Sequence, residues 1–283
     1  MSDVRWGQIP EVRKPILLAA FEGWFDAGTS ATTAVEWLRD RYEAEPVAAI
    51  DAEEFYDFTQ QRPEVRLEDG DRVIVWPETA VHAAAVAGSD NDLALMAGVE
   101  PHLRWRTFTE DVIEVAQRLD CPLVVTLGAM VGGVPHTRPS TVTGSTTSTE
   151  LGSRLGLGRP TYEGPTGIVG TLHDGLDRVG IPAVSLRVGV PHYVAGPPNP
   201  KGTRALLQRF EQVTGIRTGW PDLDRAVAEW EERVSAAVSS DDEVVDYVHQ
   251  LEEEVDRRAT EELPSGDDLA AEFQRFLREQ DED

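Results

Sequence analysis

Apolar residues follow two different patterns along the chain. Short continuous apolar runs have the length of buried strands, whereas longer segments repeat their apolar residues at the spacing of a helix. The first strand-like run is PILLAAF at 15–21, and the first helical segment is TSATTAVEWLRDRY at 29–42. The apolar face of that segment consists of Ala31, Ala34, Val35 and Leu38. The pattern therefore predicts a strand, a turn and an amphipathic helix.

The two patterns alternate as far as residue 215. Further strands are predicted at 46–51, 93–98, 122–131, 141–147 and 181–190. Further helices are predicted within 107–120, 148–156, 164–180 and 199–215. Thr109 and Thr166 are predicted to cap the helices that follow them, and Gly215 to end the last helix. Such alternation indicates an α/β fold with a largely parallel sheet and helices on its faces.

A β-hairpin is predicted at VRLEDGDRVIVW, residues 65–76, because apolar and polar residues alternate around Asp69 and Gly70. A hairpin adds antiparallel strands, so we expect the sheet to be mixed. The α/β pattern ends after GIRTGWP. We therefore place an α/β core domain at 1–218 and a helical C-terminal extension at 219–283.

The extension is acidic, with 22 Asp and Glu against 6 Arg, yet apolar stripes run through it. The first two stripes are Leu223, Val227, Trp230 and Val234, and then Val244, Val248, Leu251 and Val255. A third helix is predicted from Ser265 and carries Leu269, Phe273, Phe276 and Leu277. The stripes indicate a small all-helical appendage whose acids lie on solvated faces, rather than a functional acidic tail.

Charge and composition exclude several classes of function. The formal charge is −25, which argues against a nucleic acid or an anionic membrane as partner. No apolar run reaches the roughly 18 residues that cross a bilayer, and the N-terminus lacks a secretion signal, so we expect a cytoplasmic protein. Cys121, the single cysteine, is expected to be a small buried apolar residue. No cofactor and no metal site are expected, since none of the six histidines is paired at helical ligand spacing.

The turn GWFDAG after the first strand is the first candidate site. In open α/β sheets, ligands bind beyond the carboxyl ends of the strands. Asp26 either caps the helix that follows or holds a polar group of a ligand, and Gly23 and Gly28 shape the turn. Trp24 and Phe25 are two adjacent large aromatic residues, which cover either the core or the surface of a partner.

The tripeptide Val-Pro-His occurs twice, and each copy follows a predicted strand. His136 lies in GGVPHTRP and His192 in VGVPHYVAGPPNP. The two histidines could act as a general base with its orienting partner, or bind an anion together with Arg138. Alternatively, both are turn histidines bonded to the backbone, since no serine, cysteine or carboxylate motif completes either one.

The glycine-rich segment GPTGIVG opens a predicted helix with Gly164, Thr166 and Gly167. Its free N–H groups could receive a phosphate or a carboxylate, or the small residues could serve close helix packing. Further along this helix, His173 and Asp174 are expected on the surface. No phosphate loop, G-x-S-x-G turn or H-E-x-x-H motif is present, so the chain offers no complete catalytic set.

Five segments together, in this order and spacing, resemble the proteasome assembly chaperone 2 family and especially its actinobacterial members. They are GWFDAG, EPHLRWRTF, LGAMVGGVPHTRP, GPTGIVGTLHD and VPHYVAGPPNP. The resemblance covers about residues 12–215. It implies a three-layer α/β domain similar to nucleoside phosphorylases, and self-association into homo-oligomers such as trimers. It also implies a relation to chaperones of proteasome assembly.

Eukaryotic members of the family often end in a hydrophobic residue, a tyrosine and any residue, whereas this sequence ends in Asp281, Glu282 and Asp283. We therefore do not expect docking through the C-terminus. Two functional hypotheses remain. The first is a non-enzymatic, oligomeric interaction protein with a chaperone-like or scaffolding role, whose partners are itself and proteasome subunits. The second is an enzyme or binder of nucleosides, phosphate or carboxylates that uses the crevice at the strand ends.

Overall fold

The computed structural model describes residues 3–68 and 70–261. Within them, the strands are β1 (Val4–Trp6), β2 (Ile16–Glu22), β3 (Glu45–Ile50), β4 (Glu64–Glu68), β5 (Asp71–Val75), β6 (Thr79–Ala84), β7 (Leu93–Val99), β8 (Val124–Gly132), β9 (Val142–Thr146) and β10 (Ala183–Pro191). The α-helices are α1 (Ser30–Arg41), α2 (Trp105–Arg118), α3 (Thr149–Leu155), α4 (Ile168–Arg178), α5 (Pro200–Thr214), α6 (Asp224–Val238) and α7 (Asp242–Glu261). Three 3₁₀ turns are η1 (Ala27–Thr29), η2 (His192–Val194) and η3 (Trp220–Leu223).

Eight of these strands form one mixed sheet in the order β1-β3-β6-β7-β2-β8-β10-β9. The central strands β7, β2, β8 and β10 run parallel to one another. The strands on both flanks are antiparallel to their neighbours. Since parallel strands end at a common edge, the loops after the four central strands meet at one side of the sheet, which we call the carboxyl edge.

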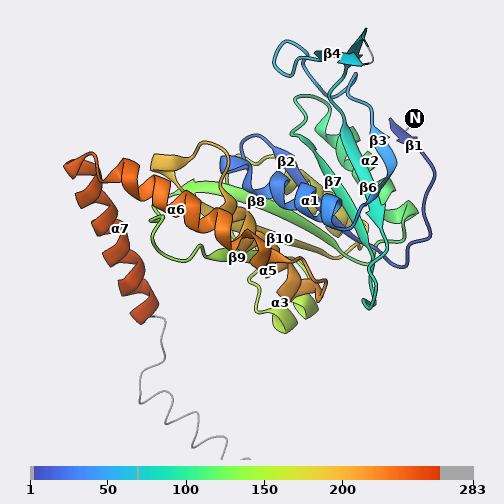
Figure 1. Cartoon of the computed structure of the whole chain (residues 1–283). Coiled ribbons are helices and arrows are strands. Elements are labelled where there is room, and N and C mark those ends of the chain that lie inside the picture. The colour runs from blue at the N-terminus through green and yellow to red at the C-terminus, as the bar shows by residue number, and fades with distance from the viewer. Residues whose placement is uncertain (1–2, 69, 262–283) are drawn as a thin grey trace, which may run out of the picture.

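The predicted hairpin forms, but it does not join this sheet. β4 and β5 pair only with each other, in register Val65 with Ile74, and the hairpin stands away from the main sheet (Figure 1). The antiparallel strands of the sheet are instead β1, β3, β6 and β9. The sequence pattern did not predict β1 or β6, because each is short and has few bulky apolar residues.

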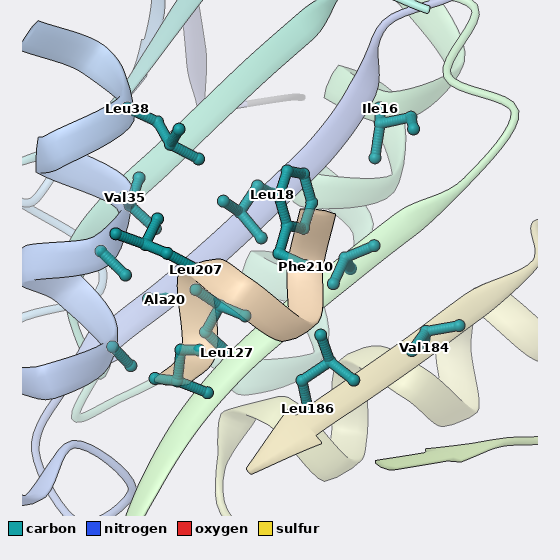
Figure 2. Close-up of a cluster of buried hydrophobic side chains, with 14 of the residues drawn as sticks. Ile16, Leu18, Ala20, Val35, Leu38, Leu127, Val184, Leu186, Leu207 and Phe210 are labelled. Atoms are coloured by element: carbon teal, nitrogen blue, oxygen red, sulfur yellow. The ribbon is translucent and has the colours of Figure 1, made fainter. Parts of the chain in front are cut away.

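Two helical layers cover the sheet. Helices α1 and α5 pack on one face, where Leu38 and Phe210 meet Leu18 and Leu127 of the strands (Figure 2). Helices α2 and α4 pack on the other face around Phe108. Full burial of one leucine or phenylalanine side chain contributes about 1.5–3 kcal/mol, so these two clusters supply most of the driving force for folding. The three-layer α/β arrangement that the resemblance implied is confirmed.

Two predicted helix starts are wrong. α2 begins at Trp105, so Thr109 lies inside the helix and is buried instead of capping it. The residue before α4 is Gly167, and the hydroxyl of Thr166 does not cap the helix. Threonine is a common cap, but helix α2 gains more by extending one turn to bury Phe108 in the core.

The C-terminal part is helical, as predicted. α6 buries Trp230 and Val234, and α7 turns back from it at one end of the molecule, far from the hairpin (Figure 1). The third predicted helix, from Ser265, lies outside the described residues. No helix in the described part of the chain combines the length and the hydropathy that a membrane span requires.

Candidate functional site

The predicted site residues come from loops at the carboxyl edge. Asp26 forms an isolated parallel bridge with Ala129, and the N–H of Ala129 donates to the carbonyl of Phe25 at 2.8 Å. The N–H of Asn199 donates to the carbonyl of Gly28 at 3.0 Å. These bonds join the loop after β2 to strand β8 and to the loop after β10, so segments far apart in sequence lie side by side at the carboxyl edge.

Asp26 is buried and acts as a cap of α1. Its carboxylate accepts from the N–H of Ala31 at 2.7 Å and from the N–H and hydroxyl of Thr32. Burial raises the pKa of Asp26 above its ordinary value, although the hydrogen bonds from Thr32 and Ala31 oppose this shift. Gly28 has φ of +63°, and a Cβ there would lie 2.8 Å from Cβ of Asn199, so the turn requires glycine.

The two adjacent aromatic residues have different environments. The ring of Phe25 lies on the sheet against Gly128, where an added Cβ would fall 1.9 Å from the ring. Trp24 is 64% exposed, and a Cβ added to Gly167 at the start of α4 would lie 3.7 Å from its ring. Phe25 therefore anchors the turn, and Trp24 projects from it into solvent.

The N-terminus of α4 is occupied by a carboxylate of the same chain. Oε1 of Glu100, the residue after β7, accepts from the N–H of Ile168 at 2.8 Å. Glu100 also lies against Gly23 and Gly167, while the nearby Gly164 contacts Tyr162. The N-terminus of α4 was predicted to bind a phosphate or a carboxylate, and in the fold it binds the carboxylate of Glu100. No motif in the sequence marks Glu100 as the partner of this helix start.

His136 holds three elements together. Its main-chain N–H donates to Oη of Tyr193 at 2.8 Å, its Nδ1 lies 2.8 Å from the same oxygen, and its Nε2 lies 3.0 Å from Oγ of Ser235. Its carbonyl accepts from Lys201, which also pairs with Glu231 of α6. Burial, and secondarily Lys201, lower the pKa of His136, so its ring is neutral near pH 7.

Arg138 and His192 both contact helix α7. The guanidinium of Arg138 binds both carboxylate oxygens of Asp256 at 2.9 and 2.8 Å, and lies 3.4 Å from Glu252. Thr137 donates to Glu252. The ring of His192 packs edge-on against Tyr247, with centroids 5.3 Å apart. The two Val-Pro-His motifs are therefore placed where the C-terminal helices cover the domain.

Little empty space remains between these groups. A cavity of about 40 Å³ lies among Val134, His136, Asn199, Lys201 and Trp230, which is enough for about one water molecule. The predicted residues thus form two neighbouring clusters. Trp24 and the turn 23–28 lie with Gly164, Thr166 and Gly167, whereas His136, Arg138 and His192 lie under α6 and α7.

A larger pocket of about 270 Å³ lies elsewhere, between α1 and strands β6 and β7. Its lining includes the apolar Leu95 and Ala97 and the titratable Glu22, Glu36 and His82. Burial raises the pKa of Glu22, and the nearby Asp26 and Glu36 add to that shift. The pocket exists because α1 leaves β6 partly uncovered, and no motif in the sequence marked it.

On the opposite face of the sheet, His173 faces inward, so its predicted surface position is wrong. Its Nε2 lies 2.8 Å from Oγ1 of Thr126, and burial lowers its pKa to about 4. Asp174 is exposed, as predicted, and pairs with Arg178. Cys121 is buried, also as predicted, and burial raises its pKa to about 12.

No group of three or more histidine, cysteine, aspartate or glutamate residues in the described ranges is placed to hold a metal ion.

Comparisons with known proteins agree with this architecture. A sequence model of the PAC2 family matches residues 20–238. A PAC2 family protein from Streptomyces avermitilis is 43% identical, with a TM-score of 0.77 over 83% of this chain and 99% of its own. A Mycobacterium tuberculosis proteasome-assembly chaperone homologue is 41% identical, with a TM-score of 0.75 over 82% and 99%. A Corynebacterium glutamicum protein of unknown function is 25% identical, with a TM-score of 0.81 over 91% and 98%. A search of curated proteins found no match.

Proposed function

Because the chain belongs to the PAC2 family, we propose that it is a chaperone-like protein that binds other protein chains at its carboxyl edge and assists their assembly. The observation that carries this proposal is the exposed indole of Trp24 on a rigid turn. We further propose that it works in the cytoplasm as a homo-oligomer, with the α/β domain at 1–218 and the helical extension at 219–283.

The turn around Trp24 is built like an anchor point for a protein partner. Phe25 packs against Gly128 behind it, and Asp26 is tied to the first turn of α1. The indole therefore projects from a backbone that is already ordered, and little conformational entropy is lost when a partner covers it. Tryptophan is also the residue type most enriched among binding hot spots.

Proteasome subunits are the partner that the relatives suggest. The Mycobacterium tuberculosis protein that is 41% identical over nearly its whole length is named a proteasome-assembly chaperone homologue. We do not extend the proposal to a small-molecule activity at this edge. Asp26, His136 and Arg138 are engaged by α1, Tyr193 and Asp256, so no polar set there points toward a ligand.

The test is direct binding of the full chain to purified proteasome α-subunits from the same organism, measured by biolayer interferometry. We expect saturable binding that weakens about 30-fold or more with Trp24→Ala, the loss typical of a hot-spot residue. Val179→Ala is the matched control, since Val179 is exposed at the far end of α4. Absent binding, or equal binding by all three chains, would refute the proposal.

A further inference from the structure

The pocket between α1 and strands β6 and β7 is separate from the two clusters described above. None of Trp24, Asp26, His136, Arg138 and His192 lines it. Its volume of about 270 Å³ is close to the lower end of the range for small-molecule sites, which is about 300–1,000 Å³. A space of this size holds more than a single water molecule and fits a small ligand.

The pocket lies where the connections of the sheet change sides. β7 and β2 are parallel neighbours, and the helix after β2 packs on one face of the sheet whereas the helix after β7 packs on the other. Glu22 and Val99 form the last register pair of these two strands, and both residues line the pocket. In open α/β sheets, ligands bind at such a change of sides, beyond the carboxyl ends of the two strands.

Small side chains on the sheet leave this space open. Helix α1 lies against β7 and β6 (Figure 1). Ala80 stands opposite Ala97 in the register of these strands, and alternation along β7 places Ala97 on the same face as Leu95, the face that α1 covers. Because two alanines stand where larger side chains would fill the gap, helix and sheet do not close on each other here. The apolar lining also includes Val35, Pro77 and Val99.

Two carboxylates of the pocket have no counter-ion. Glu22 and Glu36 are both exposed to solvent, and neither forms an ion pair or a side-chain hydrogen bond with any residue that the structure describes. Arg39, which also lines the pocket, already pairs with Asp40 at 2.9 Å. Burial raises the pKa of Glu22, and repulsion from Asp26 and Glu36 adds to this shift. A cation bound beside these carboxylates relieves the repulsion.

The geometry favours an organic cation over a metal ion. Among the residues whose positions the structure gives, no three acidic, histidine or cysteine side chains are placed to hold a metal. A hard divalent cation takes about six or more oxygen ligands, whereas an ammonium group needs only a few acceptors for its N–H groups. The ring of His82 does not repel a cation near pH 7, because burial, and secondarily Arg39, lower its pKa and keep it neutral.

We propose that the pocket is a binding site for a short aliphatic primary amine. The ammonium group binds the carboxylates of Glu22 and Glu36, and the alkyl chain lies on Leu95 and Ala97. The carboxylates select for positive charge, and the volume of the pocket limits the length of the chain. A free amine and the side chain of a lysine from another protein share this chemistry. The inference goes beyond the proposed function and is independent of it, because Trp24 does not line the pocket.

Titration of the full chain with n-butylamine, followed by NMR of the backbone amides, tests the site. Sodium chloride at about 150 mM screens the attraction that a charge of −25 exerts on any cation. We expect saturable shifts at the amides of α1 and β7. We expect none with 1-butanol or butyrate, which have the same chain length without the positive charge. Equal shifts with 1-butanol, or shifts spread over the whole acidic surface, would overturn the inference.

Three variants locate the binding. Glu22→Gln removes one charge and should raise the dissociation constant for butylamine about tenfold or more, the typical effect of losing a hydrogen bond to a charged group. Glu232→Gln removes the same charge from an exposed position on α6 and is the matched control, so the dissociation constant should not change. Ala97→Leu fills the pocket without altering any charge and should abolish binding.

Circular dichroism shows whether each variant is folded. If Ala97→Leu does not fold, Glu22→Gln decides alone, since its side chain is exposed. Binding of butylamine by Glu22→Gln with the affinity of the wild type contradicts the assigned site.

A peptide mimic distinguishes the two sources of the ammonium group. If Nα-acetyl-lysine methylamide displaces butylamine at similar concentrations, the pocket accepts a lysine side chain of a partner protein. If only free amines bind, the ligand is a small molecule. Both outcomes support the site, whereas failure of every amine to bind refutes it. Binding to α-subunits is measured separately with Trp24→Ala, so a failure of this inference is distinguishable from a failure of the proposed function.

Discussion

At the scale of a single residue, His173 links burial to a measurable pH dependence. Its Nε2 bonds to Thr126 between α4 and the sheet, and burial lowers its pKa to about 4 from 6.5. The unfolded chain therefore binds a proton at a higher pH than the folded chain. The stability from keeping this ring neutral is complete well above pH 6.5 and is lost progressively as the pH falls through 6.5 toward 4.

We expect the free energy of unfolding to fall by about 1.5 kcal/mol between pH 6.5 and pH 5 through this residue alone, since the full slope of about 1.4 kcal/mol per pH unit is reached only once the unfolded histidine is mostly protonated. Urea denaturation at several pH values measures the loss. His173→Gln keeps a hydrogen-bonding side chain for Thr126 and cannot titrate, so its stability should vary less over the same range. A parallel decline of wild type and variant would show that His173 does not titrate with the expected pKa.

At the scale of an element, helix α7 is held mainly by polar contacts at its surface. Among the residues of this helix whose burial the structure describes, Val248 alone is buried, while Arg138 and Thr137 bind Asp256 and Glu252. Exposed ion pairs contribute less than about 1 kcal/mol each. We therefore expect α7 to open far more often than the sheet does, at a free energy well below that of global unfolding.

Reversal of the charges in the Arg138–Asp256 ion pair tests how α7 is attached to the domain. Arg138→Glu places two like charges together and should speed amide hydrogen exchange across 242–258 at least several-fold, with little change in β8 or β10. Asp256→Arg in the same chain should restore protection in part, because the pair is re-formed with reversed polarity. Arg225→Glu, on the exposed side of α6, is the matched control. If the rate of amide hydrogen exchange in α7 is the same in all these variants as in the wild type, the apolar stripe alone holds the helix in place.

The elements also show what local sequence could predict. The runs at 15–21, 122–131 and 181–190 became β2, β8 and β10, since continuous apolar segments of that length favour a buried strand. Their common edge was predictable for the same reason. The identity of the groups that meet there was not, because Glu100 at the start of α4 and Tyr193 beside His136 are contacts between distant segments. The periodicity of apolar residues reports on one helix or strand at a time. Which side chains meet across different elements depends on how those elements pack, and the local pattern does not contain this information.

At the scale of the whole molecule, net charge and ion pairs act in opposite directions. The formal charge of −25 destabilises the compact state by self-repulsion, and salt screens that repulsion. Salt also weakens the ion pairs, but most of them are exposed, as in Arg225–Glu229 and Arg178–Asp174. Because exposed pairs are worth so little, relief of repulsion should prevail.

We expect the melting temperature to rise as sodium chloride increases from about 20 to 300 mM, since the Debye length falls to below about 10 Å in this range. Each 1 kcal/mol gained corresponds to about 2–4 °C for a chain of this size. Over the same range α7 should lose protection against hydrogen exchange, because Arg138 and Asp256 are screened from each other. Scanning calorimetry near pH 4.5, the isoelectric point, is the control, since the rise should vanish where the net charge does. A melting temperature that falls with salt near pH 7 would mean that the ion pairs outweigh the repulsion.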